Sequence, residues 1–129
     1  MKKTQINPWT WQDQYGFSQA WRVEGGQSVI FVSGQSSISA DGVVMHGDNF
    51  EAQVRLSFEN LHAILQQAGA SFDDVVKLVV YLVDISKLPI YGAAQAEFFK
   101  GKMPAQTVVQ VSALALPGMM VEVEAIAVL

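Results

Sequence analysis

The sequence predicts a single α+β domain over residues 1–129, with the element order β-β-α-β-α-β-β and two helices packed on one face of a mixed sheet. Three observations predict this class. Two segments carry apolar residues at helical spacing, one strand is apolar on both faces, and two more alternating strands close the chain. A chain of this length can bury a core of its own.

The first two strands are predicted before residue 36. The segment "FSQAWRV" at 17–23 is typical of a strand and stops at a glycine pair, and "SVIFV" at 28–32 is a β-branched and aromatic run that ends at Gly34. The pair Asp41-Gly42 then supplies a turn before the first helix.

Both helices are predicted from apolar stripes. The first begins near residue 48 and buries Val54, Phe58, Leu61, Leu65 and Ala68. Asp48 is its expected N-cap, with Glu51 completing a capping box, and Gly69 suits the position after its end. The second runs from about 87 to 100, with Pro89 in its first turn and a buried stripe of Ile90, Ala94 and Phe98.

The strand at 78–83, "LVVYLV", has apolar side chains on both of its faces. Both faces therefore need to be covered by other parts of the protein. Two helices can cover only one face of a small sheet. The chain is also poor in charge, at 16% charged residues against the usual value of about 25%. Both features indicate that a partner subunit covers the second face.

The closing strands are predicted at 106–112 and 120–128. On the last one, Glu122 and Glu124 are two residues apart, so both carboxylates point to one face, about 6.6 Å apart along the strand. A carboxylate between valines is costly unless it is paired or solvated. We expect one to form a structural pair with a strand lysine such as Lys77, and the other to serve a pocket as a base or as a group that orients water.

Composition argues against several function classes. The net charge is −4, and two arginines and six lysines form no basic run, which argues against nucleic-acid binding. No cysteine is present, so a thiol nucleophile and zinc–cysteine sites are excluded. His46 and His62 lack partners at metal spacing, and no cofactor motif is found. No apolar run is long enough to span a bilayer, so a cytoplasmic protein with no membrane contact is expected.

The segment Ser33-Gly34-Gln35 is a candidate binding element at a strand end. Glycine there allows close approach of another backbone or a ligand, while the serine and glutamine add a hydroxyl and an amide. The alternative reading is a plain strand-ending turn.

Several stretches together resemble the Rid family, also called the YjgF or translation-initiation-inhibitor family. The matching stretches are "YGFSQA", "FVSGQ", "NLHAILQQAGASFDDVVKLVVYLVD", "PAQTVVQV" and the tail "LPGMMVEVEAIAVL". The resemblance implies a chorismate-mutase-like homotrimer with a small-molecule cleft at each subunit interface. Deaminating members hydrolyse reactive imines and enamines to 2-oxo acids and ammonia, using a glutamate that holds water and an arginine that clamps the substrate carboxylate.

Carried over residue by residue, the resemblance implies that Glu122 is the catalytic glutamate. The implied ligand-binding positions are Phe17, Ser33, Gly34, Gln35, Tyr91 and Gln106. Phe17 stands where many members have tyrosine, and Tyr91-Gly92 stand where a polar side chain often faces the cleft. Gln106 occupies the position of the arginine.

The change at position 106 removes a fixed positive charge from the expected cleft. An arginine–carboxylate contact is charge-assisted, and loss of one partner of such a buried pair costs about 2–5 kcal/mol. A neutral ligand therefore suits the cleft better than an acid. Three functions follow: a hydrolase of an imine, enamine or related amide; a non-catalytic metabolite sensor or protein-interaction module; and, least favoured, an endoribonuclease or translation inhibitor.

Overall fold

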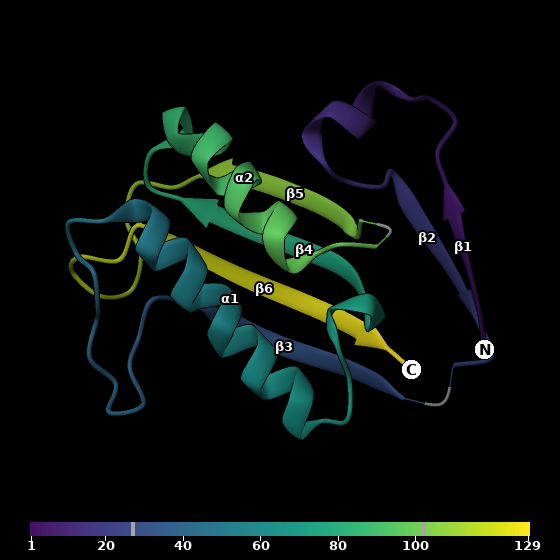
Figure 1. Cartoon of the computed structure of the whole chain (residues 1–129), viewed down its shortest axis with the longest axis horizontal. Helices are drawn as coiled ribbons and strands as arrows, with labels where there is room; N and C mark the ends of the chain where they lie inside the picture. Colours follow the sequence, from purple (N-terminus) through teal and green to yellow (C-terminus); the bar gives the residue numbers. More distant parts are fainter. Residues whose placement is uncertain (27, 102) are drawn as a thin grey trace.

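The computed structural model describes residues 1–26, 28–101 and 103–129. Its main sheet has four strands in the order β3-β6-β4-β5, namely β3 (Val29–Gln35), β6 (Val121–Val128), β4 (Val75–Leu82) and β5 (Ala105–Gln110) (Figure 1). Strands β4 and β5 are parallel, whereas β6 is antiparallel to both β3 and β4. The sheet is therefore mixed, and the predicted α+β class is confirmed.

Two helices, α1 (Phe50–Gln67) and α2 (Leu88–Phe98), cover one face of this sheet (Figure 1). Four predicted stripe residues of α1, which are Val54, Phe58, Leu61 and Leu65, have no exposed surface. The expected N-cap was wrong by one residue: the Asn49 side chain accepts from the amide of Ala52. Ala68 is the exposed C-cap rather than a stripe residue, because the helix ends at Gln67.

The predicted buried stripe of α2 was partly wrong. Ile90 is 45% exposed and Phe98 is half-buried, whereas Tyr91, Ala94 and Gln95 face the core. The reason is that "LPIYGAAQAEF" is apolar around most of the helix, so the spacing of its apolar residues fits more than one face. The packed face is fixed by contact with α1 and the sheet, not by the stripe.

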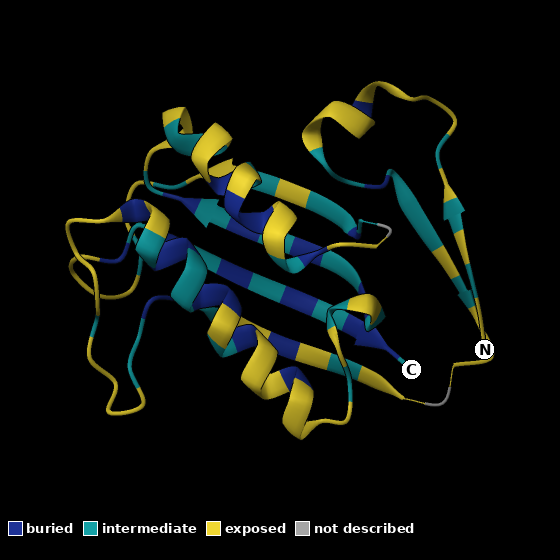
Figure 2. Ribbon diagram, viewed as in Figure 1, coloured by how far each residue is buried: buried dark blue, intermediate teal, exposed yellow. Residues whose placement is uncertain are grey.

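The opposite face of the sheet carries no helix. Along β6, buried residues alternate with half-buried ones (Figure 2). Apolar side chains on the outer strands are exposed, namely Val29 (54%) and Phe31 (77%) on β3 and Val109 (39%) on β5. These exposures leave apolar surface at both edges of the open face.

The N-terminal segment forms a separate two-stranded ribbon, β1 (Lys2–Ile6) with β2 (Ala20–Glu24), which lies beyond the end of the main sheet (Figure 1). A short 3-10 helix, η1 (Trp11–Tyr15), lies between its strands. The Ser18 amide donates to the Pro104 carbonyl (2.9 Å), and Trp21 Nε1 donates to the Met103 carbonyl (2.9 Å). The predicted first strand begins at Ala20 rather than at Phe17, and β1 was not predicted.

Two further 3-10 turns, η2 (Phe72–Asp74) and η3 (Ile85–Lys87), flank β4. Within the residues that the structure describes, no helix combines the length and the apolar character that crossing a membrane requires.

Candidate functional site

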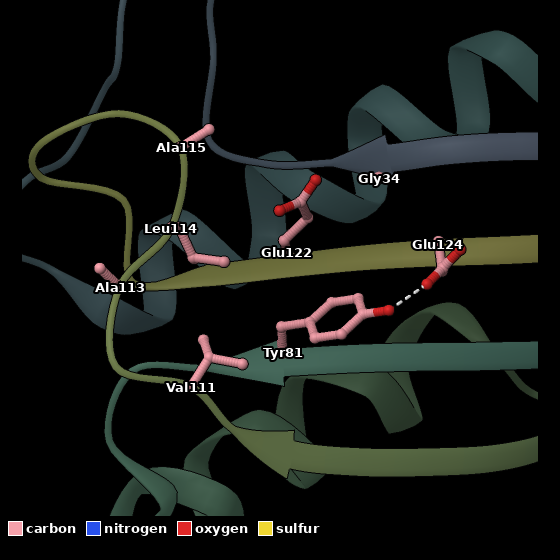
Figure 3. Close-up of a pocket in the computed structure, with 8 residues that line it drawn as sticks. All are labelled: Gly34, Tyr81, Val111, Ala113, Leu114, Ala115, Glu122 and Glu124. Atoms are coloured by element: carbon pink, nitrogen blue, oxygen red, sulfur yellow. Dashed lines mark hydrogen bonds between the residues drawn. The ribbon is translucent and has the colours of Figure 1, made fainter.

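The open face of the sheet holds the first group of candidate residues. Glu122 and Glu124 project from β6 into a shallow cavity of about 450 Å³ (Figure 3). Its other lining residues are Gly34, Tyr81, Val111, Ala113, Leu114 and Ala115. Three strands and the loop after β5 therefore build this cavity.

The two carboxylates of β6 differ in their partners. The Tyr81 hydroxyl donates a hydrogen bond to Glu124 (Figure 3), and this bond raises the pKa of Tyr81. Lys77 instead donates to Thr107 Oγ1 (3.1 Å), so the expected lysine–glutamate pair was wrong. Glu122 has neither a hydrogen bond nor an ion pair to any side chain in the described part of the protein. Glu122 is thus the carboxylate left available to water or a ligand.

Gly34 makes room for Glu122. A Cβ atom added at Gly34 would lie 1.9 Å from Glu122 Oε1 and 2.5 Å from its Cδ, so any side chain at this position would force the Glu122 side chain to move. The sequence analysis expected another backbone or a ligand to approach this glycine; the group that lies against it is the Glu122 side chain. Ser33 and Gln35 do not line the cavity; Gln35 Nε2 donates to the Ser33 carbonyl (3.1 Å).

Phe17, Tyr91 and Gln106 lie together in a second cavity of about 780 Å³ between η1, α2 and β5. Aromatic and aliphatic side chains make most of its wall: Trp11, Tyr15, Phe17, Tyr91, Leu88, Pro89 and Val108. Amide side chains supply most of the polar groups, namely Gln14, Gln95 and Gln106. We call it the amide cavity. Asp13 is the one acidic residue in its described lining, and no lysine or arginine is among the described residues that line it.

Hydrogen bonds fix two of these amides. The Tyr91 hydroxyl donates to Gln106 Oε1 (3.1 Å), and Gln95 Nε2 donates to the Gly16 carbonyl (3.4 Å). Tyr91 is 1% exposed, and this burial raises the pKa of its phenol far above the usual range. The phenol therefore stays protonated, and Gln106 Oε1 is its acceptor.

The two cavities lie on opposite faces of the sheet. Gln106 pairs in register with Leu78, which is fully buried beneath the helices, whereas Glu122 pairs with Tyr81 on the open face. Within one chain, the structure brings Glu122 together with Gly34, and Gln106 together with Phe17 and Tyr91, but it does not join the two groups.

Tyr81, Gln95 and Trp11 were missed by the sequence analysis. Side chains alternate between the two faces of a strand, so Tyr81 in "LVVYLV" points to the opposite face from Leu78. Pairing of this strand with β6 would then have predicted the contact of Tyr81 with the glutamates. The other two depend on how η1 folds over α2, and no local pattern predicts that contact. Among the described residues, no cluster of His, Asp and Glu could hold a metal ion.

The hydrogen bond between Tyr91 and Gln106 should contribute measurably to the free energy of unfolding. Gln106→Leu leaves a buried phenol without its acceptor, so we expect the free energy of unfolding to fall by about 1–3 kcal/mol. The double variant Tyr91→Phe/Gln106→Leu removes both polar groups and should recover most of that loss. Urea unfolding of the native chain and these two variants checks this; equal stability of the single and double variants would contradict it.

Comparisons with known proteins agree with this architecture. The family model described as Endoribonuclease L-PSP matches residues 12–129. A RutC family protein of Pyrococcus abyssi is 39% identical over 112 residues, covering 86% of this chain and 84% of the relative. The mouse 2-iminobutanoate/2-iminopropanoate deaminase is 35% identical over 113 residues, covering 87% and 80%.

A solved structure supports the same assignment. YyfB of Yersinia pestis, described as a protein of unknown function of the conserved Rid family, is 34% identical and superposes with a TM-score of 0.90, covering 100% of both chains. The match therefore includes the N-terminal ribbon as well as the sheet and helices. On these findings, the chain belongs to the Rid (YjgF) family, whose sequence model is described as Endoribonuclease L-PSP.

Proposed function

We propose that this protein hydrolyses an imine, an enamine or a related amide, with Glu122 positioning the attacking water. In the imine reaction, water adds to the carbon of the C=N bond, the nitrogen leaves as ammonia, and a carbonyl remains. The observation that carries the proposal is the unpaired Glu122 carboxylate, which lines a cavity and stands beside a glycine that leaves room for it. Relatives of the chain in mouse and rat are 2-iminobutanoate/2-iminopropanoate deaminases.

The proposed site combines two copies of the chain. Glu122 lies on the open face of the sheet, and the amide cavity lies on the helix side, so one chain cannot present both to one ligand. A ring of copies, each placing its Glu122 face against its neighbour's amide cavity, gives every ligand a base and a binding pocket. We expect a homotrimer, which would also cover Phe31 and Val109.

Gly34→Ala tests the role of Glu122 with little change to the fold. The new methyl group must displace the Glu122 side chain, and a misplacement of about 1 Å at a reacting group costs on the order of 100-fold in rate. We expect that loss in kcat with a melting temperature close to native, since the displaced group is a flexible surface carboxylate. Ammonia release and thermal unfolding give both values; full activity in a folded Gly34→Ala chain would contradict the role of Glu122.

A second candidate function is a non-catalytic metabolite sensor that binds through the amide cavity. The observation in its favour is that this 780 Å³ cavity is formed within one chain and includes no catalytic carboxylate from β6. Ligand-dependent stabilisation without turnover, unaffected by Glu122→Gln, would favour the sensor over the hydrolase.

A further inference from the structure

The amide cavity contains two polar groups that no protein group satisfies. Gln95 is 3% exposed, and its Nε2 is taken by the Gly16 carbonyl, so its Oε1 is the free end of the side chain. Gln95 Oε1 has no hydrogen-bond partner among the described residues and is not one of their fully buried unpaired atoms, and Gln95 lines the amide cavity. A nine-tenths-buried amide thus offers an acceptor to a ligand.

Gln106 offers the complementary group. Its Oε1 already accepts from Tyr91, so its Nε2 hydrogens are left to donate into the same cavity. The donor and the acceptor come from different elements, β5 and α2, and both are oriented by a hydrogen bond to the protein. A donor and an acceptor held in this way match the carbonyl oxygen and the N–H of an amide.

The rest of the wall selects for a flat apolar group without a negative charge. Trp11 packs edge-to-face on Phe17 (centroids 5.7 Å apart) and on Tyr15 (6.4 Å), and Trp11 and Tyr15 are half-exposed residues of the cavity wall. Such rings stack favourably on another planar group. Asp13 would repel a carboxylate, and no lysine or arginine among the described lining residues would attract one.

We propose that the amide cavity binds an uncharged ligand in which an amide is attached to an aromatic or other flat apolar group, with Gln106 donating to the amide oxygen and Gln95 accepting from the amide N–H. This proposal rests on the proposed function. It implies that the substrates of the cleft are imines or enamines in which a neutral amide replaces the carboxylate. Binding alone can be measured with stable probes, independently of turnover.

Phenylacetamide and phenylacetate are matched probes, because they differ in the group that Gln106 and Gln95 would contact. Titration calorimetry of the full-length protein should show phenylacetamide binding at least about tenfold more tightly, a difference of about 1.4 kcal/mol. The side-chain amide NMR signals of Gln95 and Gln106 should shift on its addition. Equal affinity, tighter binding of phenylacetate, or no binding of either probe would overturn the proposal.

Gly92→Leu locates the binding in the cavity. A Cβ atom at Gly92 meets no atom within 4 Å, so a leucine there fills cavity space, and replacing a helical glycine also favours α2. Affinity for phenylacetamide should fall at least about tenfold, while the exposed control Ala63→Leu on α1 should stay within about twofold. Unchanged affinity in a folded Gly92→Leu chain would overturn the assignment. Correct binding without any imine hydrolysis would instead contradict the proposed function alone.

Discussion

Gln106→Arg is expected to raise kcat/KM for 2-iminopropanoate by about 30- to 3,000-fold over the native chain, which follows from about 2–5 kcal/mol for a buried arginine–carboxylate contact. The native amide cavity has no lysine or arginine among the described residues that line it, so an acid entering it meets Asp13 and neutral amides. An arginine at position 106 would start from the same strand position and could form a bidentate contact with the substrate carboxylate.

The substitution also has a structural cost that must be separated from its effect on activity. Arginine has no acceptor, so the buried Tyr91 hydroxyl loses its partner at Gln106 Oε1. The double variant Tyr91→Phe/Gln106→Arg removes that cost. Gln67→Arg, at the exposed end of α1, adds the same charge away from the cavity.

Ammonia release from enzymatically generated 2-iminopropanoate compares the four chains. We expect gains in both Gln106→Arg variants and none in Gln67→Arg. Brisk turnover by the native chain, or no gain in a folded double variant, would contradict the claim that the missing charge limits acid substrates.

Glu122→Gln is expected to lower kcat by about 100- to 10,000-fold, the range that a positioned general base contributes. Glutamine keeps the shape of the side chain beside Gly34 but cannot accept a proton from water. Since Glu122 makes no hydrogen bond to a described residue, its replacement should change the free energy of unfolding by less than about 0.5 kcal/mol.

The matched control is Glu59→Gln, which removes an exposed carboxylate from α1. Steady-state ammonia release for both variants, with the same substrate and chain concentration, gives the comparison. If Glu122→Gln retained native kcat, hydrolysis through Glu122 would be wrong, and the sensor would become the better account of the cavities.

The periodic spacing of apolar residues predicted most of the fold, because a buried face of a helix or strand requires that spacing. The stripe of α1 and the buried face of β4 both arise from packing against the core, so their apolar spacing is plain in the sequence. Strand β1 was missed because Lys2–Ile6 contains one apolar residue, Ile6, and is stabilised by pairing with β2. The sequence of this segment alone does not indicate that it pairs with β2.

The candidate site was predicted as a set of residues but not as an arrangement. Glu122 with Gly34, and Gln106 with Phe17 and Tyr91, were identified in advance through the family resemblance. Their separation onto two faces depends on the register between β4 and its neighbours, which pairs Gln106 with Leu78. The spacing of residues shows which side chains of one strand share a face. It does not show which side chains of a neighbouring strand lie on that same face, because this depends on the register.

The central claim, that Glu122 of one copy serves the amide cavity of another, is tested most directly by mixing two chains, each impaired in a different half of the site. One carries Glu122→Gln and the other Gly92→Leu, both with Gln106→Arg so that 2-iminopropanoate turnover is measurable. The two chains are unfolded together and refolded at equal concentration. About one cleft in four should then be active, because a chain that keeps Glu122 and a neighbour that keeps Gly92 each occupy their side of a cleft with a chance of about one half. A mixture no more active than its separate components, or a monomeric mass in solution, would contradict the claim.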